Sequence, residues 1–380
     1  MTEKLYYKDA YIKEFSATVL SCERRDGGYE TVLDRTAFFP EEGGQSADRG
    51  YIGEARVLDA FERDGVVYHL TDRRVALGEV YCKLDFDERF EKMQCHTAEH
   101  ILCGIIHSLY GLENVGFHLG DDIVTFDVSA PLTREQLDEV ERLANEAVFA
   151  NIPVETSFPT QNELSLLEYR SKLELTENVR IVKIGDVDSC ACCAPHVKLT
   201  GEIGLIKVLD FERHRGGIRI IMVAGRRALV DYSKKYANIK RISAMLCTPQ
   251  HETADELSRL MSEYESLRGE LKAVKLRSAE ALASTYEQEE KNAVVFLEGF
   301  TPDELRAFAN AYKEKVGGIL VALTGEEGDY KYILMKKASD VSAEIKKINA
   351  ALLGRGGGRG EMAQGTFKST LEEIKNYFLA

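Results

Sequence analysis

The sequence predicts an α+β protein built from four segments. A small β-barrel is expected at residues 1–86, an α+β domain with a metal-binding motif at 87–228, a helical hairpin at 229–290 and a small α/β domain at 291–380. Three observations support this division. The 380 residues exceed what one compact core usually holds. The first 85 residues alternate short apolar runs with turns, whereas residues from 226 onward show helical spacing and no strand signal up to residue 290.

The N-terminal segment has the pattern of a small barrel. Two β-rich runs at 11–20 and 29–33 flank an Asp-Gly-Gly turn, which is typical of a hairpin. More short runs follow before residue 86, and many short strands in a small segment indicate a compact β-barrel. The loop at 36–45 is too glycine-rich for a strand interior, so we expect a tight turn or a close approach to a ligand there.

The second segment mixes helices with strands. From residue 87 to residue 110 apolar side chains recur at helical spacings, and Gly111 supplies a stop. A second, amphipathic helix is expected to begin at Thr133. Strands are predicted at 123–128, 179–184, 204–210 and 218–224.

The third segment is predicted to form two helices. Pro249 interrupts the first and suits the first position of the second, so an antiparallel hairpin is expected. The apolar residues of the second helix follow a 3-4-3-4-3 spacing, which is the seam of a coiled coil: Leu257, Leu260, Tyr264, Leu267, Leu271 and Val274.

The last segment alternates strands with helices, which predicts a small α/β domain. Strands are expected at 292–297, 319–323 and 330–335, and helices near 302–315, 338–353 and 371–378. A glycine run at 354–360 lies between the last two helices and contains Arg355 and Arg359. Such a run is either a flexible linker or a backbone that approaches phosphate closely, with the arginines supplying charge.

Composition narrows the class of protein. No run of about 18 apolar residues is present, so no membrane helix is expected, and the N-terminus lacks the apolar stretch of a secretion signal. Eight cysteines in a chain of this length indicate metal or thiol chemistry in a reducing, cytoplasmic compartment. The net charge of −14 disfavours a surface that binds nucleic acid everywhere, but it permits a local basic patch.

Four residues form a predicted metal site. His96 and His100 lie four positions apart, so both rings share one face of the predicted helix. Cys192 and His196 follow almost a hundred residues later, in a segment that Pro195 keeps out of a regular helix. Thiolate and imidazole together favour zinc. The histidine pair alone is explained equally well as a metal half-site or as an ordinary core or surface pair. The second cluster, with its cysteine and histidine, favours the zinc site.

Two questions about this cluster stay open from the residues alone. Cys190 and Cys193 are spare ligands, and His196 either completes a closed site or leaves its place to water. The competing chemistry is a nucleophilic Cys192 with His196 as its base. The gathering of three cysteines with three histidines favours the metal.

These motifs resemble those of a known family. The two metal half-sites, at this separation, resemble the editing domain that alanyl- and threonyl-tRNA synthetases share, and the loop at 39–45 is similar to the glycine-rich editing motif of the alanyl enzyme. Residues 216–220 and 356–364 resemble later segments of the same enzyme. No aminoacylation core or DHH triplet occurs, so the sequence is identified as a member of the stand-alone alanyl-tRNA editing proteins of the long type. It departs from the family at Glu42, where a glycine is usual, and at residues 193–195.

The resemblance implies a substrate and a reaction. The substrate would be tRNA for alanine wrongly esterified with serine or glycine, and the reaction would be hydrolysis of that ester. A zinc ion would either hold the amino or carbonyl group or lower the pKa of a bound water. Gln45 would orient the ester or the ribose, Thr36 would sense the serine hydroxyl, and His118 would lie near the pocket. Each of these three also has an ordinary structural explanation, as a turn, strand or packed residue.

The same resemblance assigns residues to tRNA binding. A basic patch at 213–227 would hold the acceptor end, and the glycine run would contact tRNA rather than serve as a linker. The predicted tRNA-binding residues are Arg215, Arg219, Arg355, Gly357, Gly358 and Arg359. A homodimer through the hairpin or the last domain is compatible with the seam. The rival classes are a non-catalytic, zinc-stabilised RNA-binding or synthetase accessory protein and a zinc hydrolase of another ester.

Overall fold

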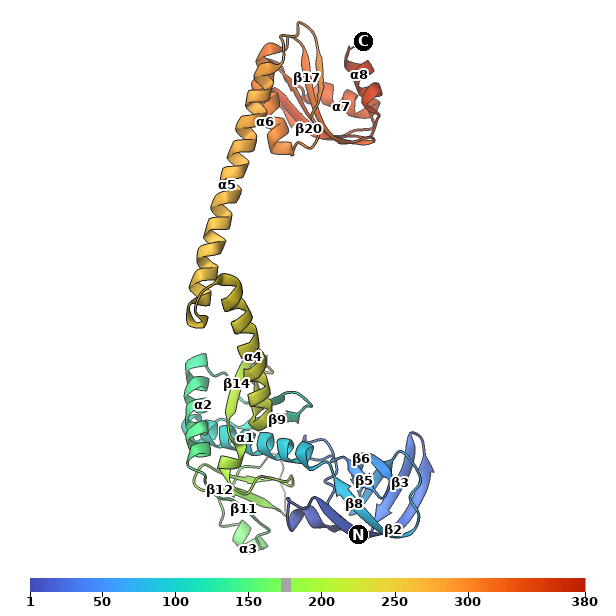
Figure 1. Ribbon diagram of the computed structural model, residues 1–380, viewed down its shortest axis with the longest axis vertical. Coiled ribbons are helices and arrows are strands. Elements are labelled where there is room, and N and C mark those ends of the chain that lie inside the picture. Colours follow the sequence, from blue (N-terminus) through green and yellow to red (C-terminus); the bar gives the residue numbers. More distant parts are fainter. Residues whose placement is uncertain (172–178, 380) are drawn as a thin grey trace. The chain divides into compact units, whose positions relative to one another are not determined.

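A computed structural model describes residues 1–171 and 179–379. The chain divides into two compact units, Met1–Lys240 and Arg241–Ala380. Both units combine helices with sheets, which confirms the predicted α+β class (Figure 1). Among the described residues, no helix combines the length and the apolar character needed to cross a membrane.

Six N-terminal strands pair in a ring. The order β2-β3-β7-β6-β5-β8 closes on itself, and every pairing in it is antiparallel. Gly27 has a φ of 91° in the turn between the first two strands, a conformation that glycine adopts without strain. The strands are β2 (Glu14–Arg25), β3 (Gly28–Leu33), β5 (Gly50–Ile52), β6 (Ala55–Arg63), β7 (Val66–Thr71) and β8 (Gly78–Leu84). A short parallel pair, β1 (Glu3–Lys4) with β4 (Arg35–Thr36), lies outside the ring.

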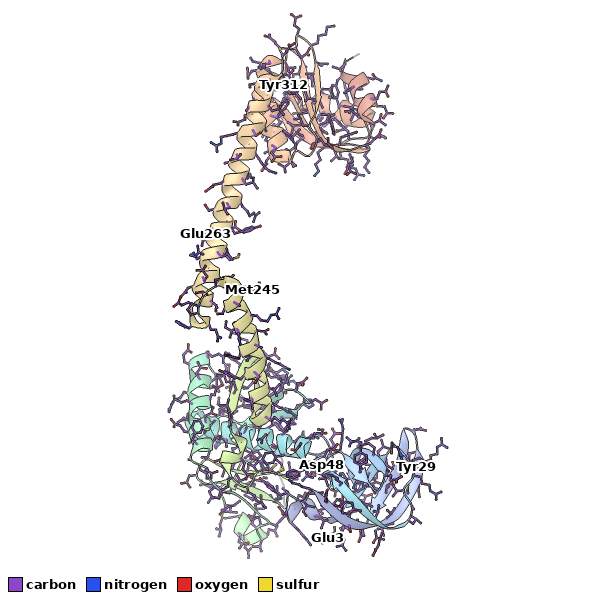
Figure 2. All side chains as sticks on the ribbon, in the orientation of Figure 1. Glu3, Tyr29, Asp48, Met245, Glu263 and Tyr312 are labelled. Atoms are coloured by element: carbon purple, nitrogen blue, oxygen red, sulfur yellow. The ribbon has the colours of Figure 1, made fainter. Side chains whose placement is uncertain are left out.

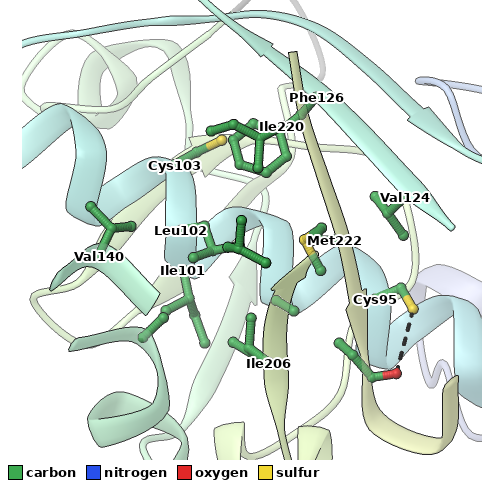
Figure 3. Packing of buried hydrophobic residues seen from close by; sticks show 14 of the residues in the cluster. Cys95, Ile101, Leu102, Cys103, Val124, Phe126, Val140, Ile206, Ile220 and Met222 are labelled. Atoms are coloured by element: carbon green, nitrogen blue, oxygen red, sulfur yellow. Dashed lines mark hydrogen bonds between the residues drawn. The ribbon is translucent and has the colours of Figure 1, made fainter. Parts of the chain in front are cut away.

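Helix α1 (Phe86–Tyr110) forms the centre of the first unit's largest core. It ends where Gly111 takes a left-handed φ of 66°, as the sequence predicts. Most of its residues from Met93 to Ile106 are buried against α2 (Arg134–Phe149) and a four-stranded sheet. Figure 3 shows the packing, in which the Cys95 thiol also reaches the Ala224 carbonyl at 3.9 Å. A helix this buried holds its side chains rigidly.

Two antiparallel sheets complete the first unit. The four-stranded sheet has the order β14-β15-β10-β9 and the three-stranded sheet has the order β11-β12-β13. Their strands are β9 (Asn114–Leu119), β10 (Val124–Val128), β14 (Ile206–His214), β15 (Gly217–Ala224), β11 (Val154–Ser157), β12 (Ile181–Ile184) and β13 (Asp188–Ala191). The short helix α3 (Gln161–Leu164) follows β11 within the three-stranded sheet, and a 3-10 turn at Thr200–Ile203 lies between β13 of that sheet and β14 of the other.

Two long helices follow in sequence. Helix α4 (Gly225–Leu246) ends before Pro249, which precedes a 3-10 turn, and α5 (Thr253–Thr285) begins four residues after the predicted start at Pro249. The predicted seam of α5 is exposed, with Leu267 63% exposed, and side chains stand out around Glu263 (Figure 2). Its buried residues within the described part of the second unit are Thr253 at its start and Ala279 and Ala283 in its last turns.

The second unit is a five-stranded sheet covered on both faces. The order is β16-β17-β18-β20-β19, with β16 parallel to β17 and the rest antiparallel. Helix α6 (Pro302–Tyr312) and the end of α5 pack on one face, and α7 (Ser342–Ala351) and α8 (Leu371–Leu379) pack on the other. The strands are β16 (Ala293–Phe296), β17 (Ile319–Glu326), β18 (Asp329–Lys336), β19 (Arg355–Arg359) and β20 (Met362–Phe367).

The glycine run is part of this sheet, so the linker alternative is wrong. Arg355–Arg359 forms β19, which pairs along its length with β20. A Cβ built at Gly356 or Gly358 would collide with the backbone of β20, so these glycines permit a close approach of two strands. Glycine carries no side chain that could show strand alternation, which is why the sequence pattern did not indicate this strand.

Candidate metal centre

Helix α1 presents two histidines to one point. His96 and His100 are both almost fully buried, and their ring centroids lie 5.4 Å apart. The i, i+4 spacing places both rings on one face of the helix, as the sequence predicts.

The loop after β13 supplies the other two donors. Pairing of β13 with β12 extends to Ala191 and so fixes the start of this loop, which then brings Cys192 and His196 to the helix histidines. The Cys192 Sγ lies 3.4 Å from the His196 Nε2 and 3.6 Å from the His96 Nε2. Ligand atoms of all four residues lie within 4.8 Å of one another.

A hydroxyl fixes the tautomer of His196. The Thr97 hydroxyl donates to the Met93 carbonyl at 2.8 Å, so its only proton is already used. The His196 Nδ1, 3.0 Å from the same oxygen, must therefore be the donor. The Nε2 of His196 is left with a lone pair directed at the cluster.

The other two imidazoles are held in the same way. The His100 Nδ1 donates to the Asp188 carboxylate at 3.0 Å, and this carboxylate also accepts two hydrogen bonds from Arg170 at 2.8 and 3.0 Å. The His96 Nδ1 donates to the Gln45 Oε1 at 2.8 Å. All three Nε2 atoms thus face the Cys192 sulfur, an arrangement that partners of metal-bound histidines usually impose.

The electrostatics of the cluster favour a thiolate with a neutral imidazole. Burial would raise the pKa of the Cys192 thiol, but the imidazoles of His96, His196 and His100 outweigh it and place that pKa well below its usual range. Burial lowers the pKa of His196 to about 3, so this ring is uncharged at neutral pH. Burial would lower the pKa of His100, but the Cys190, Asp188 and Cys192 side chains raise it well above its usual value, so zinc binding at the His100 Nε2 would release a proton. One sulfur and three nitrogen donors of this kind fit a zinc ion.

The glycine loop positions Gln45 behind this cluster. The Gly44 carbonyl accepts a hydrogen bond from the Leu119 amide at 2.9 Å, which fixes the loop to β9. Gly44 has a φ of 84°, and a Cβ there would collide with Phe117. The Gln45 side chain is fully buried, and its Nε2 has no partner among the described residues.

A cavity of about 360 Å³ opens on the metal cluster. Its wall includes both helix histidines, Cys192 and several ionisable or polar residues: Tyr7, Glu42, Glu99, Glu113, Asn114, Arg170, Arg180, Cys190 and Cys193. A cavity of this size beside a predicted zinc site is large enough for a small ester group.

All three predicted pocket residues, Gln45, Thr36 and His118, lie outside this wall. The Thr36 hydroxyl is fully buried and lies 2.8 Å from the His69 Nε2. The His69 Nδ1 donates to the Thr31 carbonyl, so its Nε2 is the acceptor and Thr36 is the donor. His118 is exposed on β9 and is not part of the cavity lining.

The spare cysteines lie beside the cluster. Cys190 is buried and forms a second group of close donor atoms with His100 and Asp188. Burial raises the pKa of Cys190 to about 11, so its thiol stays protonated. Burial and the Cys192 thiolate also raise the pKa of Cys193 above its usual range. Only Cys192 among these three is therefore poised as a thiolate.

The predicted tRNA-binding residues differ in their surroundings. Arg219 donates two hydrogen bonds to Asp127 across the pair β10–β15, at 2.8 and 2.9 Å. Arg215 is exposed at the turn between β14 and β15. The other four residues are exposed on β19 in the second unit: Arg355, Gly357, Gly358 and Arg359.

Sequence reasoning missed several residues around the cluster. Thr97 and Glu99 stand inside the His-x-x-x-His motif, where their position was a usable signal. Asp188 and Arg180 carry no such signal, because only folding brings them to α1 and to the cysteine loop.

Comparisons with known proteins match both units. Residues 179–243 match the family model described as threonyl and alanyl tRNA synthetase second additional domain, and residues 289–379 match the DHHA1 domain. The sequence is 31% identical to the alanyl-tRNA editing protein AlaX-L of Pyrococcus horikoshii, over 98% of this chain and 96% of that protein.

Alanine–tRNA ligases are also similar. The ligase of Halorubrum lacusprofundi is 33% identical over 96% of this chain, and that of Pyrococcus furiosus is 31% identical over 98%. The chain spans 42% and 43% of the length of these two ligases. A solved C-Ala domain from the Aquifex aeolicus alanyl-tRNA synthetase covers 23% of this chain and 87% of its own, with 20% identity and a TM-score of 0.21, which is too low to bear on the fold.

Proposed function

This chain belongs to the family of alanyl-tRNA editing proteins, and we propose that it hydrolyses the ester of tRNA for alanine that carries serine or glycine. It is thus an aminoacyl-tRNA deacylase. The observation that carries this proposal is the convergence of three Nε2 atoms and one thiolate beside an open cavity. A purely structural zinc site would not need such a cavity.

The chain's own residues hold the metal and the ester. His96, His100, Cys192 and His196 would bind zinc, which when bound supplies Lewis acidity toward the ester or lowers the pKa of a water. Gln45 accepts a hydrogen bond from the His96 Nδ1, and its amide nitrogen has no partner among the described residues. Because Gln45 is fully buried and lies outside the cavity wall, it would act on the ester through the His96 ligand that it orients.

The loop at 36–45 and the residues that hold it would distinguish a wrongly attached serine from alanine. Thr36 donates to His69 and accepts from the Phe38 amide at 3.1 Å, so it would act on a serine side chain by positioning the loop that follows. Recognition of serine by hydrogen bonding discriminates strongly against alanine, which lacks the hydroxyl.

One deacylation assay tests the proposal. Seryl-, glycyl- and alanyl-tRNA for alanine are each incubated with the wild type and with Cys192→Ala. We expect the wild type to release serine and glycine much faster than alanine, and Cys192→Ala to lose both zinc and activity. Cys247→Ala is the matched control, since Cys247 is exposed and lies outside the cavity wall.

Two results would contradict the proposal. Seryl-tRNA that survives as long with the wild type as in buffer would indicate a non-catalytic, zinc-stabilised RNA-binding protein. Equal hydrolysis of seryl esters on unrelated tRNAs would indicate a zinc hydrolase of broader range.

A further inference from the structure

Arg180 is a buried cation that has no partner carboxylate among the described residues. It lies just before β12 and is 6% exposed. Its Nη1 donates to the carbonyls of Cys192 and Ala194 at 2.9 and 2.8 Å. Among the described residues, none places a carboxylate within ion-pair distance of it, and Glu42 of the same cavity wall hydrogen-bonds the Cys193 thiol instead.

A second arginine on the same cavity shows the contrast. Arg170 is also largely buried, but both of its hydrogen bonds go to the Asp188 carboxylate, so its charge is compensated. An uncompensated charge at this depth is unfavourable for folding. Burial indeed lowers the pKa of Arg180 from its usual value. Such a residue fits a site whose anion arrives with the ligand.

The guanidinium of Arg180 has donors to spare. Its Nε is buried and has no hydrogen-bond partner among the described residues, while Nη1 is occupied by the two carbonyls. Arg180 lines the cavity, and its guanidinium carbon lies 5.6 Å from the centroid of the Tyr7 ring, which is part of the same wall. A planar guanidinium of this kind suits phosphate oxygens, which it can bind in pairs.

The opposite charge lies elsewhere on the wall. Glu99, on α1 between the two helix histidines, is 4% exposed and has no ion-pair partner among the described residues. Its carboxylate accepts hydrogen bonds only from neutral groups, the Asn114 amide and the Cys103 thiol, in the part of the chain described. Besides the metal cluster and the paired Arg170, the described wall of the cavity therefore presents one buried cation, Arg180, and one buried anion, Glu99. An aminoacyl ester on a nucleotide carries the complementary pair, a cationic ammonium and an anionic phosphate.

We propose that Arg180 binds the phosphodiester that joins the terminal nucleotide of the substrate to the rest of the tRNA. This inference rests on the proposed function. Arg180 would repel the ammonium of the amino acid, which the Glu99 side of the cavity attracts. The two charges would thus orient the ester across the metal cluster.

A binding measurement tests the contact without catalysis. The probe is an RNA minihelix that ends in CCA and carries no amino acid. The linkage before its last nucleotide is either a phosphodiester or an electrically neutral methylphosphonate. At one fixed salt concentration, we expect the wild type to bind the phosphodiester probe roughly tenfold more tightly, in the range of a charge-assisted hydrogen bond. Arg180→Met should abolish this difference and Arg180→Lys should retain part of it. Arg142→Met, on the exposed face of α2, is the matched control.

Three outcomes would overturn the inference. The wild type would bind both probes equally, Arg180→Met would keep the full difference, or Arg180→Met would weaken both probes alike while zinc content falls. The last result would assign Arg180 to holding the Cys192 loop.

Hydrolysis of two substrates separates binding from chemistry. Arg180→Met should raise the KM for a seryl minihelix with little change in kcat, and should leave hydrolysis of seryl adenosine, which lacks the phosphate, unchanged. A fall in kcat on both substrates would place Arg180 at the reacting ester and contradict the proposal. If the wild type hydrolyses neither substrate but still discriminates between the two probes, the proposed function is wrong and the phosphate contact stands.

Discussion

Asp188 orients a metal ligand without belonging to the predicted ligand set. Its carboxylate accepts a hydrogen bond from the His100 Nδ1 and forms an ion pair with Arg170. Asp188→Asn would weaken the hold on the ring and leave Arg170 buried without a compensating charge. We expect zinc affinity to fall about 10- to 100-fold, as loss of such partners usually causes. Competition with a chromophoric chelator measures the affinity.

A neighbouring acid provides the control for this prediction. Asp186 is exposed in the turn before β13, so Asp186→Asn should leave zinc affinity unchanged. Equal affinities for Asp188→Asn and the wild type would show that His100 is oriented by other contacts.

His69 predicts a pH dependence of stability. Burial lowers its pKa to about 4 from 6.5, so the folded state keeps the ring neutral. Between pH 6.5 and pH 4 the unfolded state binds more protons, and stability must therefore fall as the pH falls through this window. From pH 7 to pH 5 the loss attributable to His69 is about 2 kcal/mol.

Urea unfolding followed by circular dichroism at the two pH values measures this loss. His69→Gln keeps a neutral polar group beside Thr31 and Thr36 and should have a smaller pH dependence by that amount. Identical pH dependence in both proteins would mean that His69 is accessible to protons in the folded state.

Sequence distance decides which residues of the site could be predicted. The spacing of His96 and His100 is fixed by helix geometry alone, so the pattern suffices. The contact between His100 and Asp188 joins residues 88 positions apart and depends on how β13 packs against α1. The burial of Arg180 could not be predicted either, because a single arginine before a strand carries no sequence pattern that indicates burial.

Arg215 and Arg219 lie on the hairpin of β14 and β15 and were both predicted to bind tRNA, but their surroundings differ. Arg219 is held by Asp127 on the neighbouring strand, whereas Arg215 is exposed at the turn with a φ of 45°. Only an arginine without a protein partner can release counterions from tRNA at no structural cost. Arg215→Asn, which tolerates the left-handed backbone, should reduce the salt slope of tRNA binding by about one.

Arg219→Met should behave differently. It leaves Asp127 without its hydrogen-bond donors, so we expect lower thermal stability and an unchanged salt slope. Fluorescence anisotropy across a salt series measures the slopes, and thermal melts measure stability. A lower slope for Arg219→Met would show that Arg219 leaves Asp127 to contact RNA.

Periodic elements were predictable, and one non-periodic strand was not. The expected helix at 87–110 and strand at 218–224 agree closely with α1 and β15, because buried faces impose a repeat on the sequence. The exposed strand β19 has no buried face and therefore no repeat. The seam of α5 has a clear repeat but is exposed in the described chain, so pairing with a second copy stays a prediction.

At the scale of the whole molecule, the two units have separate cores. The core around α1 belongs to the first unit, and the two faces of the five-stranded sheet form the cores of the second. Both groups of close metal-ligating side chains found among the described residues lie in the first unit. A ligand that binds one folded unit stabilises that unit and not the other.

Zinc removal should therefore affect one unfolding transition. With free zinc at about 100 times its dissociation constant, bound metal stabilises the first unit by roughly 2.7 kcal/mol. In differential scanning calorimetry, a chelator should lower one transition and leave the other in place. Cys192→Ala should shift the same transition and abolish the effect of the chelator. Two transitions that move together would instead show that the units unfold as one, because the loss of zinc would then be transmitted to a core that holds none of its ligands.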